Sequence, residues 1–152
     1  SSTGSVTGAV INSSGLFEAA KTGTVMELNR LTTDGTILNF RKTGTTVGSI
    51  SVTSSATAFN TSSDLRLKET IAAADDAGSK VDSIQVRKFD WKADGSHQDY
   101  GMVAQELQAV TPEAVSGDAD SEDMMGVDYS KLVPMMLKEI QSLRARVAQL
   151  ES

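Results

Sequence analysis

The chain has 152 residues and a net charge of −6, enough length for one ordinary domain or for a small domain with an appendage. This acidic balance argues against nucleic acid as a partner, because binding a phosphate backbone calls for a basic face. With no cysteine and a single histidine, His97, the sequence offers no disulfide framework and no Cys- or His-based metal site, and we expect no cofactor. No apolar run approaches the roughly 20 residues that span a bilayer, so a membrane is not an expected partner.

Residues 1–62 are rich in Gly, Ser and Thr and contain no proline. They begin in mid-pattern at Ser1-Ser2-Thr3-Gly4, and we expect the chain to be the C-terminal piece of a longer protein. Apolar and polar residues alternate in three short runs, at 26–29, 38–41 and 49–53. Alternation with a period of two is typical of β-strands. A flexible Ser/Thr linker is the alternative interpretation of this composition.

Turn residues separate these runs. Asp34-Gly35 predicts a tight turn between the first two, and Gly44 and Gly48 bracket the next reversal. We therefore expect a β-meander from about 24 to 53, with a further strand around 16–20. Strands this short offer one thin apolar stripe and rarely bury enough surface to fold alone. The economical solution is several identical chains that pool their stripes into one intertwined all-β stem over residues 1–62.

Residues 63–152 have the pattern of a small mixed α+β domain. We expect an amphipathic helix from Asp64 to about Ala74, with the Asp64 carboxylate at its positive end. Leu67 and Ile71 would face inward from this helix, and Gly78 would follow as a stop.

A strand rich in aromatic residues follows, ending in Phe89-Asp90-Trp91, and Asp94-Gly95 turns it. We expect the returning strand at 100–104 and a helix at 105–110 that Pro112 stops. Trp91 and Tyr100 are interpreted as core or interface residues rather than ligand-binding ones.

The stretch 117–123 is acidic. Asp118-Ala119-Asp120 suggests a calcium loop, but an EF-hand requires glycine at loop position 6 and glutamate at position 12. Asp123 and Tyr129 occupy those positions, so a solvated loop is favoured.

The C-terminal region predicts one long helix over 129–151, with Asp128 as its N-cap and Pro134 bending its second turn. Its apolar residues recur at alternating spacings of four and three, which defines a heptad. The a positions are Val133, Ile140 and Val147, and the d positions are Met136, Leu143 and Leu150. Before Ile140 we expect the helix to pack on its own domain, and past Ile140 to pair with other chains.

Flanking charges support a parallel partner, since Glu139 would meet Arg144 of a neighbouring chain and Arg146 would meet Glu151. β-Branched residues at a with leucine at d would by themselves favour two strands, so the heptad leaves the stoichiometry open.

Ser63 and Lys68 stand five residues apart, where the composition changes. A serine hydroxyl becomes a nucleophile when a neighbouring base takes its proton, and a lysine can do so when it is held neutral by burial or by a nearby cation. Such a pair at a domain boundary suggests that the chain cuts itself there. The alternative is a helix-capping serine followed by a solvated lysine.

Three blocks now occur in one order. Ser63-Asp64-Leu65-Arg66-Leu67-Lys68-Glu69, Tyr100-Gly101-Met102-Val103-Ala104-Gln105-Glu106-Leu107 and Gly126-Val127-Asp128-Tyr129-Ser130-Lys131-Leu132-Val133-Pro134 resemble the endosialidase-type intramolecular chaperone domain. This domain closes many bacteriophage tail fibres and tail spikes and occurs in some animal membrane-anchored transcription factors. The resemblance covers 63–152. Residues 1–62 are similar to a fibre stem only in their general composition and strand pattern.

The resemblance implies a homotrimer in which the C-terminal domain, a trimeric coiled coil at its long helix, aligns three chains and nucleates folding of a triple-stranded β-helix stem. The domain then acts once as a self-cleaving serine endopeptidase and is released. Ser63 would be the nucleophile, Lys68 its base, and Ser62-Ser63 the scissile bond. Arg66 could help to keep Lys68 neutral, and Asp64, Glu69 and His97 could assist, although each is also explained as structural or solvated.

This family context also implies assembly in the host cytoplasm, residence in the virion, and a host-surface receptor contacted through the stem. The alternative function is a trimerisation or receptor-binding tip that stays attached and is not cut.

Overall fold

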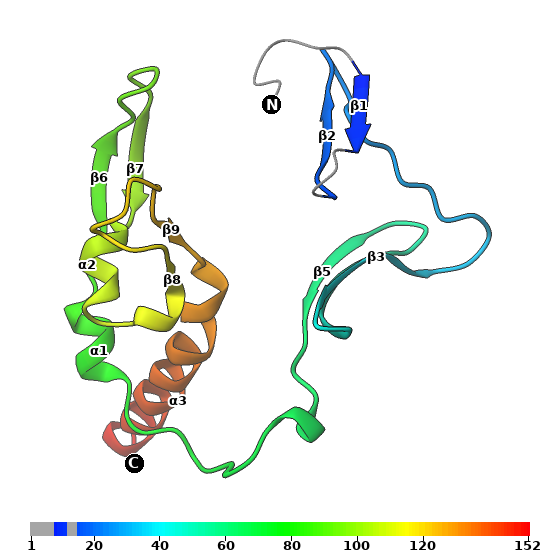
Figure 1. Cartoon of the computed structure of the whole chain (residues 1–152). Helices are drawn as coiled ribbons and strands as arrows, with labels where there is room; N and C mark the ends of the chain where they lie inside the picture. The colour runs from blue at the N-terminus through cyan, green and yellow to red at the C-terminus, as the bar shows by residue number, and fades with distance from the viewer. Residues whose placement is uncertain (1–7, 12–14) are drawn as a thin grey trace. The chain divides into compact units, whose positions relative to one another are not determined.

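The computed structural model describes residues 8–11 and 15–152, so the first four residues, on which the expectation of a longer protein rests, lie outside it. The chain divides into two compact units, Ser1–Thr70 and Ile71–Ser152. In the described part of the chain, every sheet is small and antiparallel, and one long helix ends the second unit (Figure 1). This confirms the mixed α+β class. None of the described helices is both long and apolar enough to cross a membrane.

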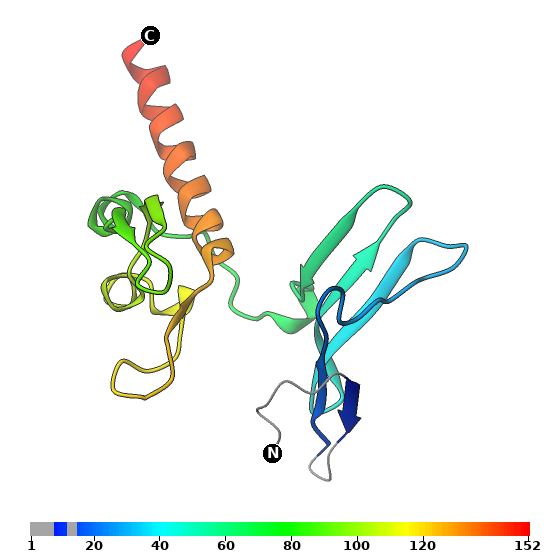
Figure 2. The same cartoon turned by 90° about the horizontal axis from the view of Figure 1, so that it is seen from above.

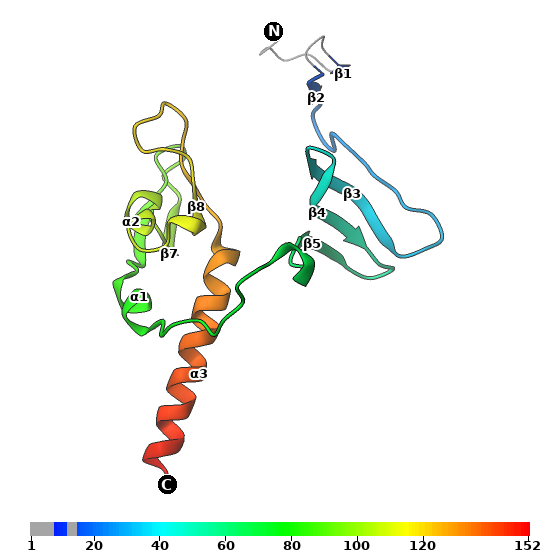
Figure 3. The same ribbon diagram turned by 60° about the horizontal axis from the view of Figure 1, so that its bottom comes forward.

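The first unit is built from hairpins. A two-stranded sheet pairs β1 (Gly8–Ile11) with β2 (Phe17–Ala20). A three-stranded sheet follows in the order β3 (Gly35–Lys42), β4 (Thr45–Val52) and β5 (Thr57–Thr61), with the strands side by side in Figure 3. A 3-10 turn, η1 (Leu65–Leu67), lies after β5.

The β3–β4 turn consists of Thr43 and Gly44, both with positive φ, between the paired residues Lys42 and Thr45. Two consecutive positive φ values match the twist of the strands that a two-residue turn connects. The reversal that was expected between Gly44 and Gly48 is therefore shorter, because Gly48 lies within β4. A Cβ on Gly48 would come within 2.9 Å of the Asn60 carbonyl oxygen of β5, so the close approach of two backbones requires glycine there.

The expected strands around 16–20, 38–41 and 49–53 are confirmed as β2, β3 and β4. The expected strand at 26–29 is wrong, since residues 24–31 are not in a strand and Asp34-Gly35 does not close a hairpin. Val25, Met26 and Leu28 are about half exposed, and no strand among the described residues pairs with this alternating segment. The strand β5 was not expected from the sequence.

The second unit combines four short helical segments, two hairpins and a long helix. Its elements are α1 (Gly78–Ser83), β6 (Arg87–Asp90), β7 (His97–Gly101), α2 (Ala104–Gln108), η2 (Pro112–Ala114), β8 (Val115–Ser116), β9 (Gly126–Val127), η3 (Tyr129–Leu132) and α3 (Val133–Leu150). β6 pairs with β7 and β8 with β9, both antiparallel.

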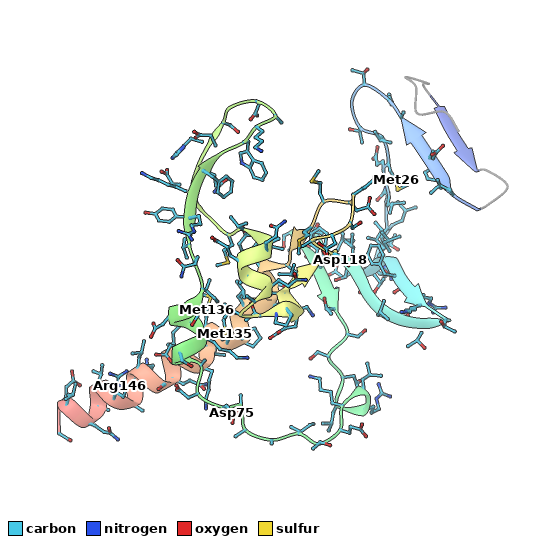
Figure 4. All side chains as sticks on the ribbon, turned by 60° about the vertical axis from the view of Figure 1, so that its left-hand side comes forward. Met26, Asp75, Asp118, Met135, Met136 and Arg146 are labelled. Atoms are coloured by element: carbon cyan, nitrogen blue, oxygen red, sulfur yellow. The ribbon has the colours of Figure 1, made fainter. Side chains whose placement is uncertain are left out.

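The core of the second unit is small. Leu107 of α2, Ala114 of η2 and Leu132 of η3 are buried together. Five partly buried residues pack around them: Ile84, Met102, Val115, Val127 and Met135. Met135 and Met136 lie next to each other at the start of α3 in Figure 4, and only Met135 joins this core. Leu132, which precedes α3, and Met135 in its first turn thus attach the start of the long helix to this core.

The expected helix over 64–74 is wrong. Only Leu65–Leu67 form a 3-10 turn, and residues 68–77 are in neither a helix nor a strand. Leu67 and Ile71 are exposed rather than inward-facing, and Thr70 has a positive φ of 52°, which is incompatible with a helix. A helix this short needs a surface to pack on, and its apolar residues have none within the described chain. Gly78, expected as a stop, begins α1.

Other boundaries shift by a few residues. The β6–β7 hairpin confirms the strand through Phe89 and the turn at Asp94-Gly95, where Gly95 has a φ of 73°. The returning strand is His97–Gly101 rather than 100–104, and α2 begins at Ala104. The stretch 117–123 is a loop, as expected, and the Asp118 carboxylate accepts a hydrogen bond from the Asp120 backbone N–H within it.

The C-terminal helix begins with a 3-10 turn. The Asp128 carboxylate accepts a hydrogen bond from the Ser130 backbone N–H at 3.0 Å, which confirms the N-cap. The regular α-helix starts at Val133, and Pro134 therefore lies in its first turn instead of bending a second one. Proline is tolerated there because the first backbone N–H groups of a helix have no partner within it.

Candidate active site

Ser63 and Lys68, the two residues paired by sequence spacing, are in direct contact. The Lys68 Nζ donates a hydrogen bond to the Ser63 Oγ over 2.7 Å. Both residues belong to the first compact unit, since the boundary between the two units falls after Thr70. The expected domain boundary at residue 63 stays a prediction.

The 3-10 turn explains why the two side chains meet. Backbone hydrogen bonds run from Leu67 N–H to the Asp64 carbonyl and from Lys68 N–H to the Leu65 carbonyl, at 3.1 and 3.0 Å. The Asp64 carboxylate accepts a further bond from the Arg66 N–H at 2.8 Å and so caps the turn. Three residues of turn reverse the chain and return Lys68 towards Ser63, so the contact is made by local structure alone.

Arg66 and Asp64 are engaged with each other. The guanidinium donates to both carboxylate oxygens of Asp64, at 2.9 and 2.7 Å. These bonds hold the pKa of the Asp64 carboxyl below its usual range and raise the pKa of Arg66. Asp64 is thus kept ionised as a capping group, and the Arg66 charge is directed at Asp64. Their assistance to Lys68 stays a prediction.

Ser62, the residue before the expected cut, is tied to β4. Its backbone N–H donates to the Val47 carbonyl, and its Oγ donates to the Thr46 carbonyl, each at 3.1 Å. Ser62 follows β5 directly and extends the pairing of β5 with β4 by one residue. Sequence reasoning missed this anchor because no spacing rule links Ser62 to residues 15 positions earlier.

The whole segment 62–69 is exposed to solvent in the single chain. Water therefore reaches Lys68, whereas a lysine that acts as a base must be neutral and hence desolvated or placed near another cation. The local geometry of the pair is present, and the surroundings that would activate it are not supplied by the described part of this chain. Glu69 is exposed next to Lys68.

His97 lies at the start of β7, in the other compact unit. Its Nδ1 is 2.5 Å from the Asp90 carboxylate across the hairpin, and its Nε2 is 3.4 Å from that of Asp99. These contacts give His97 a structural role in the β6–β7 hairpin, and its assistance in catalysis stays a prediction.

The middle block of the family resemblance shapes the β6–β7 hairpin and its junction with α2. A Cβ on Gly101 would lie 2.6 Å from Cε1 of the Phe89 ring, so only glycine leaves room for that ring. Phe89 in turn packs edge-on against Trp91, with ring centroids 5.3 Å apart. Arg87 of β6 binds Glu106 of α2 through two hydrogen bonds, at 3.0 and 2.8 Å.

Trp91 and Tyr100 border an open hollow of about 650 Å³ with Met124 and Tyr129. Tyr100 is 80% exposed, so it is not a core residue, and its role in an interface stays a prediction. In the described part of the chain, no group of three or more His, Asp or Glu residues is arranged to hold a metal ion.

The heptad residues form one exposed stripe on α3. Their side chains are 44 to 57% exposed, except Leu150 at 87%, and the members are Val133, Met136, Ile140, Leu143, Val147 and Leu150. Ile140, Leu143 and Val147 line a shallow hollow with Arg144 and Glu151. The C-terminal half of the helix, red in Figure 2, stands clear of the other elements of its unit.

A different face of α3 meets its own domain. Lys138, Gln141 and Ser142 share a hollow with Asp76, and the Glu139 carboxylate would lie 3.3 Å from a Cβ on Gly78 of α1. One oxygen of Glu139 is buried there, although a pairing of Glu139 with Arg144 of another chain was expected. The polar side of α3 thus packs inward while the apolar stripe is left uncovered, which is the reverse of an ordinary amphipathic helix.

Two comparisons identify relatives. Residues 63–116, just over a third of the chain, match a peptidase family described as the chaperone of endosialidase. The resemblance drawn from the sequence is thereby confirmed for this segment, which contains the first two of the three blocks. A long tail fibre protein, Gp37 of Escherichia phage AR1, is 31% identical over 78 residues, covering 47% of this chain. The match spans only 7% of the length of that fibre protein.

Proposed function

From the match of residues 63–116 to the chaperone-of-endosialidase family, we propose that the chain is the self-releasing folding template of a phage tail fibre or spike. Three copies assemble through the C-terminal domain, align the β-rich segments that precede it, and cut themselves between Ser62 and Ser63. The released domain leaves a trimeric stem in the virion, where a host-surface receptor is its expected partner. The observation that carries this proposal is the 2.7 Å contact between Lys68 Nζ and Ser63 Oγ.

The cut is written as an N-to-O acyl shift followed by hydrolysis. The Ser63 Oγ attacks the Ser62 carbonyl carbon, while a neutral Lys68 amine accepts the hydroxyl proton. The C–N bond breaks, the Ser63 nitrogen takes a proton from the lysine, and an ester joins the Ser62 acyl group to the Ser63 Oγ. Water then hydrolyses the ester, which leaves a carboxylate at Ser62 and a free α-amine at Ser63.

The exposure of segment 62–69 supports a dependence of the cut on assembly. A single chain leaves Lys68 in water, and a neighbouring chain that covered it would exclude that water and favour the neutral amine. Cutting would then report that three chains have come together correctly. The Asp64 and Leu65 backbone N–H groups, which precede the N–H groups bonded within the 3-10 turn, are candidate donors to the oxyanion.

The need for a template follows from the first unit. None of residues 15–70 is buried, and Val25, Met26 and Leu28 keep an alternating apolar pattern without a partner strand. Non-local strand pairing is slow, and strands rich in Gly and Ser specify their register weakly. Clamping three C-termini makes the later pairing effectively intramolecular. The exposed stripe of α3 is the surface that would form this clamp, as a coiled coil.

Expression followed by denaturing electrophoresis and mass spectrometry tests the cut. We expect the wild-type chain to give two fragments, the second beginning at Ser63, and Ser63→Ala to remain whole. Lys68→Arg keeps a positive charge but cannot become neutral, so we expect it to remain whole as well. Ser54→Ala, an exposed serine in the β4–β5 loop, is the matched control and should be cut normally.

A trimerisation or receptor-binding tip that stays attached is the second candidate. It is favoured by the solvent exposure of Lys68, because the described chain does not supply the burial that a lysine base requires. A wild-type chain that stays whole at trimer mass would establish this function and reject self-cleavage.

A further inference from the structure

We propose that Ser62 is a positioning residue, and that its two bonds to β4 make the cut depend on the folding of the stem sheet within each chain. This inference rests on the proposed self-cleavage at Ser62-Ser63 and adds a regulation of the same site. Its basis is that the two sides of the scissile bond are held by different parts of the structure.

The nucleophile side is held by near neighbours. Ser63 and Lys68 are five residues apart, and the turn that joins them is closed by bonds among residues 64 to 68. Contacts at this separation can form before the rest of the chain has folded. The Ser63–Lys68 contact can therefore form whether or not the stem sheet has folded.

The acyl side is held by distant residues. The Ser62 Oγ bond spans 16 positions to reach the Thr46 carbonyl, and the Ser62 N–H bond reaches Val47. Thr46 is paired in turn with Arg41 of β3, so a continuous set of backbone pairs connects the scissile bond to all three strands. The two Ser62 bonds exist only when the end of β5 lies beside β4.

Attack requires the hydroxyl oxygen and the carbonyl carbon to be held together in a reactive geometry, and displacements near 1 Å cost roughly a hundredfold in rate. Ser62 supplies the carbonyl carbon. A chain whose β4–β5 edge has not formed keeps its Ser63–Lys68 contact but leaves the Ser62 carbonyl unrestrained. Premature cutting, which would detach the template from an unfolded stem, is thereby slowed.

Two variants disturb the acyl side without touching Ser63 or Lys68. Ser62→Ala removes the Oγ bond and keeps the backbone one, while Ser62→Thr keeps both. Gly48→Ala places a Cβ 2.9 Å from the Asn60 carbonyl oxygen, next to the Gly48–Thr61 pair that precedes Ser62. It should push the end of β5 away from β4.

The full chain is followed after a pulse of synthesis, with the cut fraction measured against time and the oligomer mass measured in parallel. We expect Ser62→Ala to be cut about tenfold more slowly. Gly48→Ala should be about a hundredfold slower at unchanged oligomer mass, and Ser62→Thr should keep the wild-type rate. Hydroxylamine, which cleaves esters, should trap less intermediate in Ser62→Ala, because formation of the ester is the affected step.

Cutting of Ser62→Ala at the wild-type rate overturns the inference and leaves self-cleavage intact, as does equal slowing of Ser62→Thr. A wild-type chain that stays whole overturns self-cleavage itself, and the inference with it. Should Gly48→Ala fail to assemble, the comparison between Ser62→Ala and Ser62→Thr decides the matter.

Discussion

The two compact units of this chain differ most in what they bury. Residues 71–152 enclose Leu107, Ala114 and Leu132, with Leu132 only 4% exposed. Residues 15–70 contain no buried residue, although they form the larger sheet. The first unit is therefore held by backbone hydrogen bonds and turns, and the second has a small hydrophobic core.

This difference shows that forming strands and stabilising a fold are separate problems. Gly, Ser and Thr permit close β-pairing but supply little apolar surface, so a sheet of these residues is completed by surfaces outside its own chain. A template fits such a sheet because it brings those surfaces together.

Separating the units should have the largest effect. Expressed alone, residues 71–152 should keep helical circular dichroism and a cooperative melt, because their core is internal. Residues 1–62 alone should show neither a cooperative transition nor a defined oligomer, because residues 15–62 contain no buried core to lose. Prompt folding of 1–62 as a single copy would contradict the need for a template.

Substitution on the exposed stripe of α3 should have an intermediate effect. Ile140→Asn removes an apolar side chain that we expect to be buried between chains, which should weaken association by about 1.5–3 kcal/mol per chain. Sedimentation analysis should show a shift from trimer towards monomer with helicity retained. Gln141→Asn, on the neighbouring face, is the matched control, and an unchanged mass for Ile140→Asn would show that the stripe is not the interface. Arg146, labelled in Figure 4, lies on the same uncovered half of the helix.

Acid should have the smallest effect, through the cap of the C-terminal helical region. Hydrogen bonds from the Ser130 side chain and backbone hold the pKa of the Asp128 carboxyl below its usual value. A carboxyl with a lowered pKa in the folded state stabilises the fold above its unfolded pKa, near 3.9, and loses this effect as the pH falls through the folded value. Thermal melts should therefore separate wild type from Asp128→Ala at pH 7, and the gap should narrow as the pH falls below about 3.9. A constant gap would contradict this, and Asp120→Ala, in the acidic loop, is the control.

Much of the candidate site follows from short-range pattern. Ser63 is in contact with Lys68, Asp64 caps the turn that follows it, and the α3 stripe is exposed. The catalytic and oligomerisation roles of these residues stay predictions. The helix over 64–74 was not recovered, because its apolar residues have nothing to pack on and Thr70 leaves the helical region. The pattern identified the apolar residues of that segment but not that the described chain supplies no surface for them to pack on.

The sequence by itself determined what neighbours along the chain can decide, namely the contact of Ser63 with Lys68 and the uncovered stripe of α3 past Ile140. Only the tertiary structure decided that β5 binds β4, that Ser62 is anchored to Thr46 and Val47, and that Glu139 packs against α1 instead of facing outward. The physical reason is that these contacts join residues far apart in the chain. Their formation depends on which distant surface supplies a hydrogen-bonding or packing partner, and no local spacing encodes that choice.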